Sequence, residues 1–233
     1  MIDLHFRSNE KELMDAPGIP FAAMSDLLKD LNIVNTLLGG HKITVKGLKK
    51  IIGKQKEITV CEIGCGGGDN LFAIYKYCLK KKMSIRFIGI DISKECIDFA
   101  KERYPQLSCE WICSDYATVD LQQNPPTVIF SSLFCHHFTN EELISMLRWL
   151  QKNSKLGFFI NDLHRHWLAY YSIKYLTRLF SRSYLMKYDA CLSVARSFRK
   201  NEWKELLIKA AIKNHMVSWQ WAFRFLVICR NKN

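Results

Sequence analysis

From residue 57 onward, short apolar runs of strand length alternate with segments of helix length. The strand-like runs are 57–63, 85–91, 107–114, 127–132 and 156–162, and the helix-length segments are 69–82, 93–103 and 140–152. Several of the runs are rich in β-branched or aromatic residues, which favour strands. Short buried strands that alternate with helices form a parallel sheet covered on both faces. The alternation therefore predicts an α/β fold with a doubly wound, mostly parallel sheet.

Two of the predicted helices have well-marked starts. Ser93 stands before the segment KECIDFAKERY, and either Thr139 or Asn140 precedes EELISMLRWL. Such residues cap helix N-termini, and both segments carry acidic residues in the first turn. We therefore expect helices to begin at these two positions.

The chain of 233 residues, 48% of them hydrophobic, can bury one substantial core. We expect an N-terminal helical cap over 1–56 and a main domain over 57–233, with an insertion at 164–200, all in one compact unit. No apolar run is long enough to span a bilayer, and the start MIDLHFRSNEKELMD is charged where a signal peptide is apolar. We therefore expect a cytoplasmic protein.

Nine scattered cysteines, an odd number in a chain of this size, favour free thiols over disulfides. Cys61 and Cys65 are four apart, as are Cys109 and Cys113, but neither pair is a CxxC motif and no histidine has zinc-finger spacing. We therefore expect no metal site. The formal charge of +12 fits an anionic ligand, nucleic acid, a membrane surface or a merely solvated lysine-rich surface.

A glycine-rich turn, VCEIGCGGGDN, follows the first predicted strand. The turn has the pattern E-x-G-x-G-x-G, formed by Glu62, Gly64, Gly66 and Gly68. It lies between the first strand and the first helix, the place where nucleotide-binding sheets bring their backbone close to a ligand. Dehydrogenases space their glycines as G-x-G-x-x-G, for a pyrophosphate. The tighter spacing and the acidic residue suit a cationic ligand better. A tight turn without a ligand is the alternative.

The next three strands also end in polar residues. Asp91 comes about twenty residues after the glycines, where a carboxylate can accept both ribose hydroxyls. Asp115 follows the third strand, beside Tyr116, and can accept from an adenine amino group. The stretch SSLFCHHF follows the fourth strand. Open α/β sheets bind their ligands at this carboxyl edge.

At these residues, over roughly 57–162, the sequence resembles the class I S-adenosylmethionine-dependent methyltransferases of the small-molecule kind. The resemblance implies that the glycine turn holds the methionine part of the cofactor, Asp91 the ribose, and Asp115 with Tyr116 the adenine. The cofactor-binding set that it implies is Glu62, Gly64, Cys65, Gly66, Asn70, Asp91, Ile92, Asp115, Tyr116 and Ser131.

The resemblance extends, more loosely, beyond these motifs. The tail MVSWQWAFRFLVICRN is similar to the antiparallel strand pair that closes this seven-stranded Rossmann-like fold. Segments on both sides of the core, among them LMDAPGIPFAAM, FINDLHRH and SVARSFRKNEWKELL, resemble a bacterial subgroup associated with polyketide or quinone-like pathways.

Methyl transfer asks the protein to align the acceptor and, for a hydroxyl, to remove its proton. His136 and His137 follow the fourth strand, and we expect His136 to act as the base. The alternative is that one of the two packs and the other caps a helix. Asp162 and His166, with Arg165 between them, could orient the acceptor or could simply form a polar helix start.

The segment 167–188 interleaves aromatic and apolar residues with basic ones. It could form a lid, a homodimer face, an interfacial helix that touches a membrane, or a plain core helix. Together with helices around 20–52, it would roof an apolar acceptor pocket. We expect a monomer or a homodimer.

The predicted function is S-adenosylmethionine-dependent methylation of a small aromatic or lipophilic acceptor, with oxygen favoured over carbon as the methylated atom. The alternatives are an RNA or protein methyltransferase that uses the basic surface, and a non-catalytic protein that binds the same cofactor. The stretch NPPT (124–127) differs from the N-P-P-aromatic motif of amino-methylating enzymes, because it precedes its strand and ends in threonine. We therefore expect no specific nucleic-acid partner.

Overall fold

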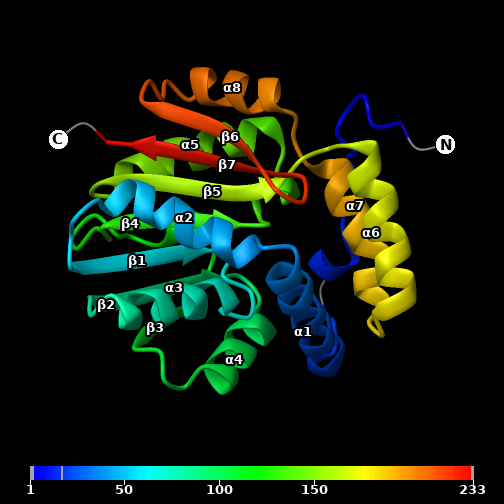
Figure 1. The fold of residues 1–233 in the computed structure, drawn as a ribbon, viewed down its shortest axis with the longest axis horizontal. Coiled ribbons are helices and arrows are strands. Elements are labelled where there is room, and N and C mark those ends of the chain that lie inside the picture. The colour runs from blue at the N-terminus through cyan, green and yellow to red at the C-terminus, as the bar shows by residue number, and fades with distance from the viewer. Residues whose placement is uncertain (1–2, 17, 232–233) are drawn as a thin grey trace.

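The computed structural model describes residues 3–16 and 18–231 and contains a seven-stranded sheet with helices on both faces (Figure 1). The strands are β1 (Glu57–Ile63), β2 (Ser84–Asp91), β3 (Cys109–Cys113), β4 (Val128–Ser132), β5 (Gly157–Leu163), β6 (His215–Gln220) and β7 (Arg224–Arg230). The α-helices are α1 (Phe21–Leu37), α2 (Gly40–Ile52), α3 (Asp69–Lys80), α4 (Lys94–Arg103), α5 (Asn140–Asn153), α6 (Trp167–Phe180), α7 (Tyr184–Arg196) and α8 (Lys200–Lys209). Three short 3-10 helices are η1 (Leu13–Asp15), η2 (Tyr116–Thr118) and η3 (Cys135–His137).

The strand order is β3-β2-β1-β4-β5-β7-β6. The first five strands are parallel, and β7 runs antiparallel between β5 and β6. The predicted doubly wound sheet and the antiparallel pair in the tail are therefore confirmed. The chain reverses its direction of travel across the sheet between β1 and β4, which is where ligands bind in open α/β sheets.

Alternating side chains of the strands supply two cores. In β1, Ile58 and Val60 pack in the cluster that contains residues of α2 and α3, whereas Cys61 and Ile63 pack in the cluster formed with α5 and α8. Because side chains alternate along a strand, each buried strand serves both helical layers. All nine cysteines lie in the described part of the chain and are free thiols, as expected.

Both predicted helix starts are confirmed. The Ser93 hydroxyl accepts a hydrogen bond from the Cys96 amide at the start of α4. Of the two candidates before α5, Thr139 is the cap, and it forms a capping box with Glu142. These caps supply partners for the otherwise unpaired first amides of each helix.

Residues 1–56, expected as one cap, occupy two different places; of them, 1, 2 and 17 lie outside the described residues, as do 232 and 233 of the main domain. Helix α1 lies beyond the carboxyl ends of the parallel strands, packed between α4 and α7 (Figure 1). Helix α2 instead covers the face of the sheet, where Gly47 lies against the Phe159 ring of β5.

The expected insertion forms α6 and α7, which lie together at the strand ends (Figure 1). Their exposed large side chains include Trp167, Tyr175, Leu179, Phe180 and Tyr184. Within the described part of the chain, no helix combines the length and the apolar character needed to cross a membrane. Membrane contact and dimerisation through this surface stay predictions.

A glycine sets the distance between α2 and the sheet. A Cβ on Gly47 would lie 2.5 Å from the Phe159 ring, which is itself stacked on Phe130 with ring centroids 4.8 Å apart. We expect Gly47→Ala to lower the free energy of unfolding by roughly 1–3 kcal/mol through overpacking, although alanine is the better helix former by about 1 kcal/mol. Denaturant titration measures the loss.

The control is the same substitution in a Phe159→Leu background. If the ring is the obstacle, the penalty for Gly47→Ala shrinks there, and the double-mutant cycle gives a clear coupling energy. An equal penalty in both backgrounds would show that the helix is held at this distance by something else.

Candidate functional site

A cavity of about 1370 Å³ opens at the carboxyl edge of the parallel strands. Nine of the ten residues predicted to bind the cofactor line it: Glu62, Gly64, Cys65, Gly66, Asn70, Asp91, Ile92, Asp115 and Tyr116. The tenth, Ser131, is buried near the Cys135 thiol and lies outside the lining, whereas the next residue, Ser132, is part of it. Successive strand residues point to opposite faces, so a shift of one position moves a side chain away from the cavity.

The turn after β1 needs glycines for two reasons, its backbone conformation and its packing. Gly64, Gly66 and Gly68 all have positive φ angles, of 63°, 48° and 75°. A Cβ on Gly64 would overlap the Phe134 ring, and one on Gly68 would lie 2.8 Å from Trp111. Two of the glycines therefore make room for protein side chains. Gly66 lines the cavity, and a Cβ added there would have a Leu28 side-chain carbon 3.6 Å away.

Glu62 places a buried carboxylate at the cavity wall. Its Oε1 accepts a hydrogen bond from Asn70 Nδ2 at 3.1 Å, while Oε2 has no hydrogen-bond partner among the described residues. Burial raises the pKa of Glu62 well above its usual range. An unpaired buried acceptor is costly, so this oxygen suits a ligand that brings a donor, above all a cationic one.

Asp91 is held by two backbone amides at the end of β2. Its Oδ2 accepts from the Gly66 amide at 2.8 Å and its Oδ1 from the Ser93 amide at 2.9 Å. Burial raises the pKa of Asp91, against the lowering effect of these two bonds. Each carboxylate oxygen can accept a second bond, so both remain usable by a diol at the cavity wall.

Asp115 and Tyr116, which follow β3, also line the cavity. The Asp115 carboxylate accepts from the Ala117 amide at 2.9 Å and caps η2. The Tyr116 ring packs edge-on against Phe134, Phe138 and Trp149. The tyrosine is thereby fixed as a flat apolar surface next to the Asp115 acceptor.

The four predicted catalytic residues lie in different environments. His137 lines the cavity, whereas His136, Asp162 and His166 lie outside its lining in the described structure. His136 is buried, and its Nδ1 donates to Asp162 Oδ1 at 2.8 Å. Burial alone would raise the pKa of Asp162, but His136 lowers it overall.

His166 caps the start of α6. Its Nδ1 accepts from the Leu168 amide, and its ring stacks on Phe223 at a centroid distance of 5.0 Å. Neighbouring Arg165 pairs with Glu202, at 3.0 Å between Nη1 and Oε2, rather than with Asp162. Arg165 and His166 therefore serve the packing of α8 and α6 respectively.

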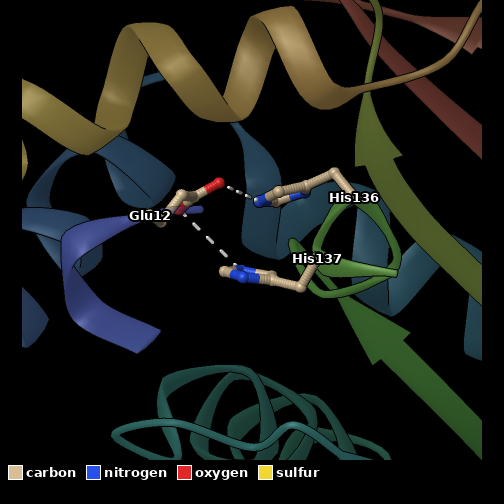
Figure 2. A group of neighbouring side chains, drawn as sticks. All are labelled: Glu12, His136 and His137. Atoms are coloured by element: carbon tan, nitrogen blue, oxygen red, sulfur yellow. Dashed lines mark ion pairs between the residues drawn. The ribbon is translucent and has the colours of Figure 1, made fainter. Parts of the chain in front are cut away.

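The N-terminal segment contributes site residues that the sequence analysis did not assign. Glu12 lies beside both histidines of η3, whose rings point toward it (Figure 2), with 3.5 Å from Oε1 to His136 Nε2 and 3.9 Å from Oε2 to His137 Nε2. His137 Nδ1 donates to Asp15 Oδ2 at 3.0 Å. Burial alone would lower the pKa of His137, but Asp15 and Glu12 raise it overall.

Two arginines hold this segment and η3 together. Arg196 of α7 donates to the carbonyls of His136 and His137, at 3.0 and 2.8 Å, and Arg7 donates to the Phe138 carbonyl at 2.8 Å. In the sequence this segment shows only its dense charge, MIDLHFRSNEKELMD, with no apolar period. Nothing in the local sequence shows that these charges meet residues 136 and 137.

The family described as "Methyltransferase domain" matches residues 60–156. Phosphoethanolamine N-methyltransferase 1 of Arabidopsis thaliana is 29% identical over 124 residues. The match covers 51% of this chain but spans only 24% of the length of that relative.

Solved methyltransferases share the fold. The plantazolicin methyltransferase BpumL, in complex with S-adenosylhomocysteine, aligns with a TM-score of 0.66 at 16% identity, over 91% of this chain and 95% of its own. An O-methyltransferase family 2 protein of Planctomyces limnophilus, in complex with apigenin, aligns with a TM-score of 0.63 at 17% identity, over 93% of this chain and 63% of its own.

These matches agree with the strand order, the glycine turn and the acidic strand ends described above. Residues 60–156 match the methyltransferase-domain family, and the chain has the fold of solved S-adenosylmethionine-dependent methyltransferases.

Proposed function

We propose that this protein methylates an oxygen of a small, lipophilic hydroxyl compound. The observation that carries the proposal is a single cavity that reaches from Glu62 and Asp91 to His137. Its volume of about 1370 Å³ is larger than a pocket for one drug-sized ligand, which reaches about 1000 Å³. The cavity therefore has room for a cofactor and an acceptor side by side.

The strand ends supply the cofactor half of the cavity. The unpaired Oε2 of Glu62 fits the amino group of the methionine part, and Asp91 fits the ribose hydroxyls. Asp115 and the ring of Tyr116 fit the polar edge and the face of adenine. When bound, S-adenosylmethionine supplies a methyl group already activated on a sulfonium.

The acceptor half is mostly apolar. Its lining from the N-terminal segment and α1 includes Met14, Ile19, Met24, Leu28 and Leu31, and η3 and its surroundings add Phe134 and Phe138. Binding in such a pocket favours an apolar acceptor, because its surface leaves water. The apigenin complex of the Planctomyces protein concerns that protein, but it supports an aromatic hydroxyl compound as the first class to test.

His137 is the polar group that we place next to the reacting hydroxyl. Two carboxylates lie beside its ring: that of Asp15, which also lines the cavity, and that of Glu12 behind the wall. In the proposed reaction a bond forms between the acceptor oxygen and the methyl carbon, the bond from carbon to sulfur breaks, and the hydroxyl proton passes to the Asp15 carboxylate, which lines the cavity. S-adenosylhomocysteine is the other product.

The segment before α1 and α1 itself cover the cavity, which argues against a macromolecular acceptor. Residues 6–9 and 14–19, where described, line it together with α1. A base or a peptide side chain would have to enter beneath this cover, whereas a small molecule fits inside it. The RNA or protein methyltransferase and the non-catalytic cofactor-binding protein are therefore the second choices.

The proposed ribose contact predicts a loss of cofactor affinity. Asp91→Asn keeps the size of the side chain but replaces one acceptor oxygen by a donor. We expect binding of S-adenosylhomocysteine to weaken by roughly 1–3 kcal/mol, because a hydroxyl loses its charged acceptor. Isothermal titration calorimetry measures it. Asp98→Asn, at an exposed site paired with Lys94, is the matched control and should bind normally. An unchanged affinity in Asp91→Asn would place the ribose elsewhere.

The proposed acceptor contact predicts a loss of turnover without a loss of cofactor affinity. For His137→Gln we expect the rate of S-adenosylhomocysteine formation, with the best acceptor from a panel of phenols and other hydroxylated aromatics, to fall roughly 10²–10⁴-fold. Its affinity for S-adenosylhomocysteine should stay near that of the wild type. His215→Gln, in β6 at the sheet edge, is the control. Full turnover in His137→Gln together with its loss in His166→Ala would move the acceptor to the residues after β5.

A further inference from the structure

We propose that Glu12, His136 and His137 bind a divalent metal ion of the zinc type at the wall of the cavity. One ligand atom from each lies within 4.8 Å of the other two. The carboxylate oxygens of Glu12 lie 3.5 and 3.9 Å from the two Nε2 atoms. Ligands of tetrahedral zinc are about 2.0–2.1 Å from the ion and hence about 3.3 Å from one another. Small rotations of these side chains would suffice to close the site.

The second nitrogen of each histidine ring supports the same assignment. His136 Nδ1 donates to Asp162 at 2.8 Å, and His137 Nδ1 donates to Asp15 at 3.0 Å. In the neutral form of a ring held in this way, the lone pair lies on Nε2, the atom that faces Glu12 (Figure 2). A carboxylate behind a ligating histidine is the usual arrangement around bound zinc, because it fixes the ring and raises its basicity.

Glu12 itself is an unexplained buried anion. Its Oε1 makes no hydrogen bond of acceptable geometry within the described structure, although it is buried. The nearest guanidinium, that of Arg196, lies 3.9 Å away and directs its hydrogen bonds to backbone carbonyls instead. A buried carboxylate without a partner is costly, and a cation between it and the two rings would remove that cost.

The donor set indicates the kind of ion. Two imidazoles and one carboxylate form the ligand set of catalytic zinc sites, which leave a fourth position open. Since His137 lines the cavity, an ion held here lies at the wall where we place the acceptor hydroxyl. A bound cation stabilises the ionised form of such a hydroxyl. This chemical role rests on the proposed function, but binding of the ion does not.

The site departs from the sequence expectation of no metal. That expectation rested on the spacing of cysteines and histidines, whereas the present ligands are far apart in the sequence: Glu12 comes just before η1, and the two histidines belong to η3. No local spacing pattern records such a pairing, so only the folded structure brings these ligands together.

The test is a titration of the chelator-treated, dialysed full chain with Zn²⁺, and with Co²⁺, whose visible absorption reports tetrahedral coordination. We expect one equivalent to bind to the wild type and to raise its Tm. Asp15→Asn should weaken Zn²⁺ binding by about 10–100-fold, and Glu12→Gln should weaken it more. Cys113→Ser removes an exposed thiol that could hold zinc adventitiously, and it should bind like the wild type.

Calorimetric binding of S-adenosylhomocysteine shows whether each variant is folded. No stoichiometric Zn²⁺ binding by folded wild type, or equal binding by folded Glu12→Gln, would overturn the metal site. Zn²⁺ binding without methyl transfer to any acceptor would leave the metal site standing and count against the proposed function. Methyl transfer at the full rate in the chelated, metal-free protein would overturn the role of the ion in the reaction.

Discussion

The arrangement of parallel strands around β1 determines where every other part of the site can lie. Because β1, β2, β3 and β4 run in the same direction, their carboxyl ends meet at one edge of the sheet. A turn that carries a polar residue or a glycine follows each of these strands, and no single turn would suffice to hold a nucleoside. The Gly66 amide bound to Asp91 shows this cooperation directly, since one strand end positions the carboxylate of the next.

The second organising feature is electrostatic. The segment 3–16 returns to the sheet edge and places Glu12 and Asp15 against the two histidines of η3, while Arg7 and Arg196 bind the carbonyls of the same loop. Of these charged groups, Glu12 and Arg196 are buried, so their charges depend on the groups packed around them. The N-terminal segment is therefore tied to the loop that carries His137. The segment that covers the cavity and the loop residues that line it are therefore held together.

The sequence was most informative where a local pattern has a single physical meaning. Alternating apolar runs predicted the parallel sheet, and the caps at Ser93 and Thr139 marked helix starts. Glu62, Asp91 and Asp115 were expected at one edge because they end neighbouring strands, and all three line the same cavity. The sequence was less informative about which of two neighbouring residues faces the cavity. Ser131 and Ser132, like His136 and His137, differ in whether they face the cavity, and that depends on the register of β4 and the path of η3.

Other features depend on contacts between distant segments. The packing of Phe134 on Gly64, of Phe159 on Gly47, and of Glu12 on the η3 histidines leaves no trace in any short window of sequence. Calorimetric titration of the wild-type chain with S-adenosylhomocysteine tests the central claim most directly. We expect a single site per chain with micromolar affinity, for which S-adenosylmethionine competes. Absence of heat and of competition with either compound would contradict the assignment of the strand-end cavity as the cofactor site.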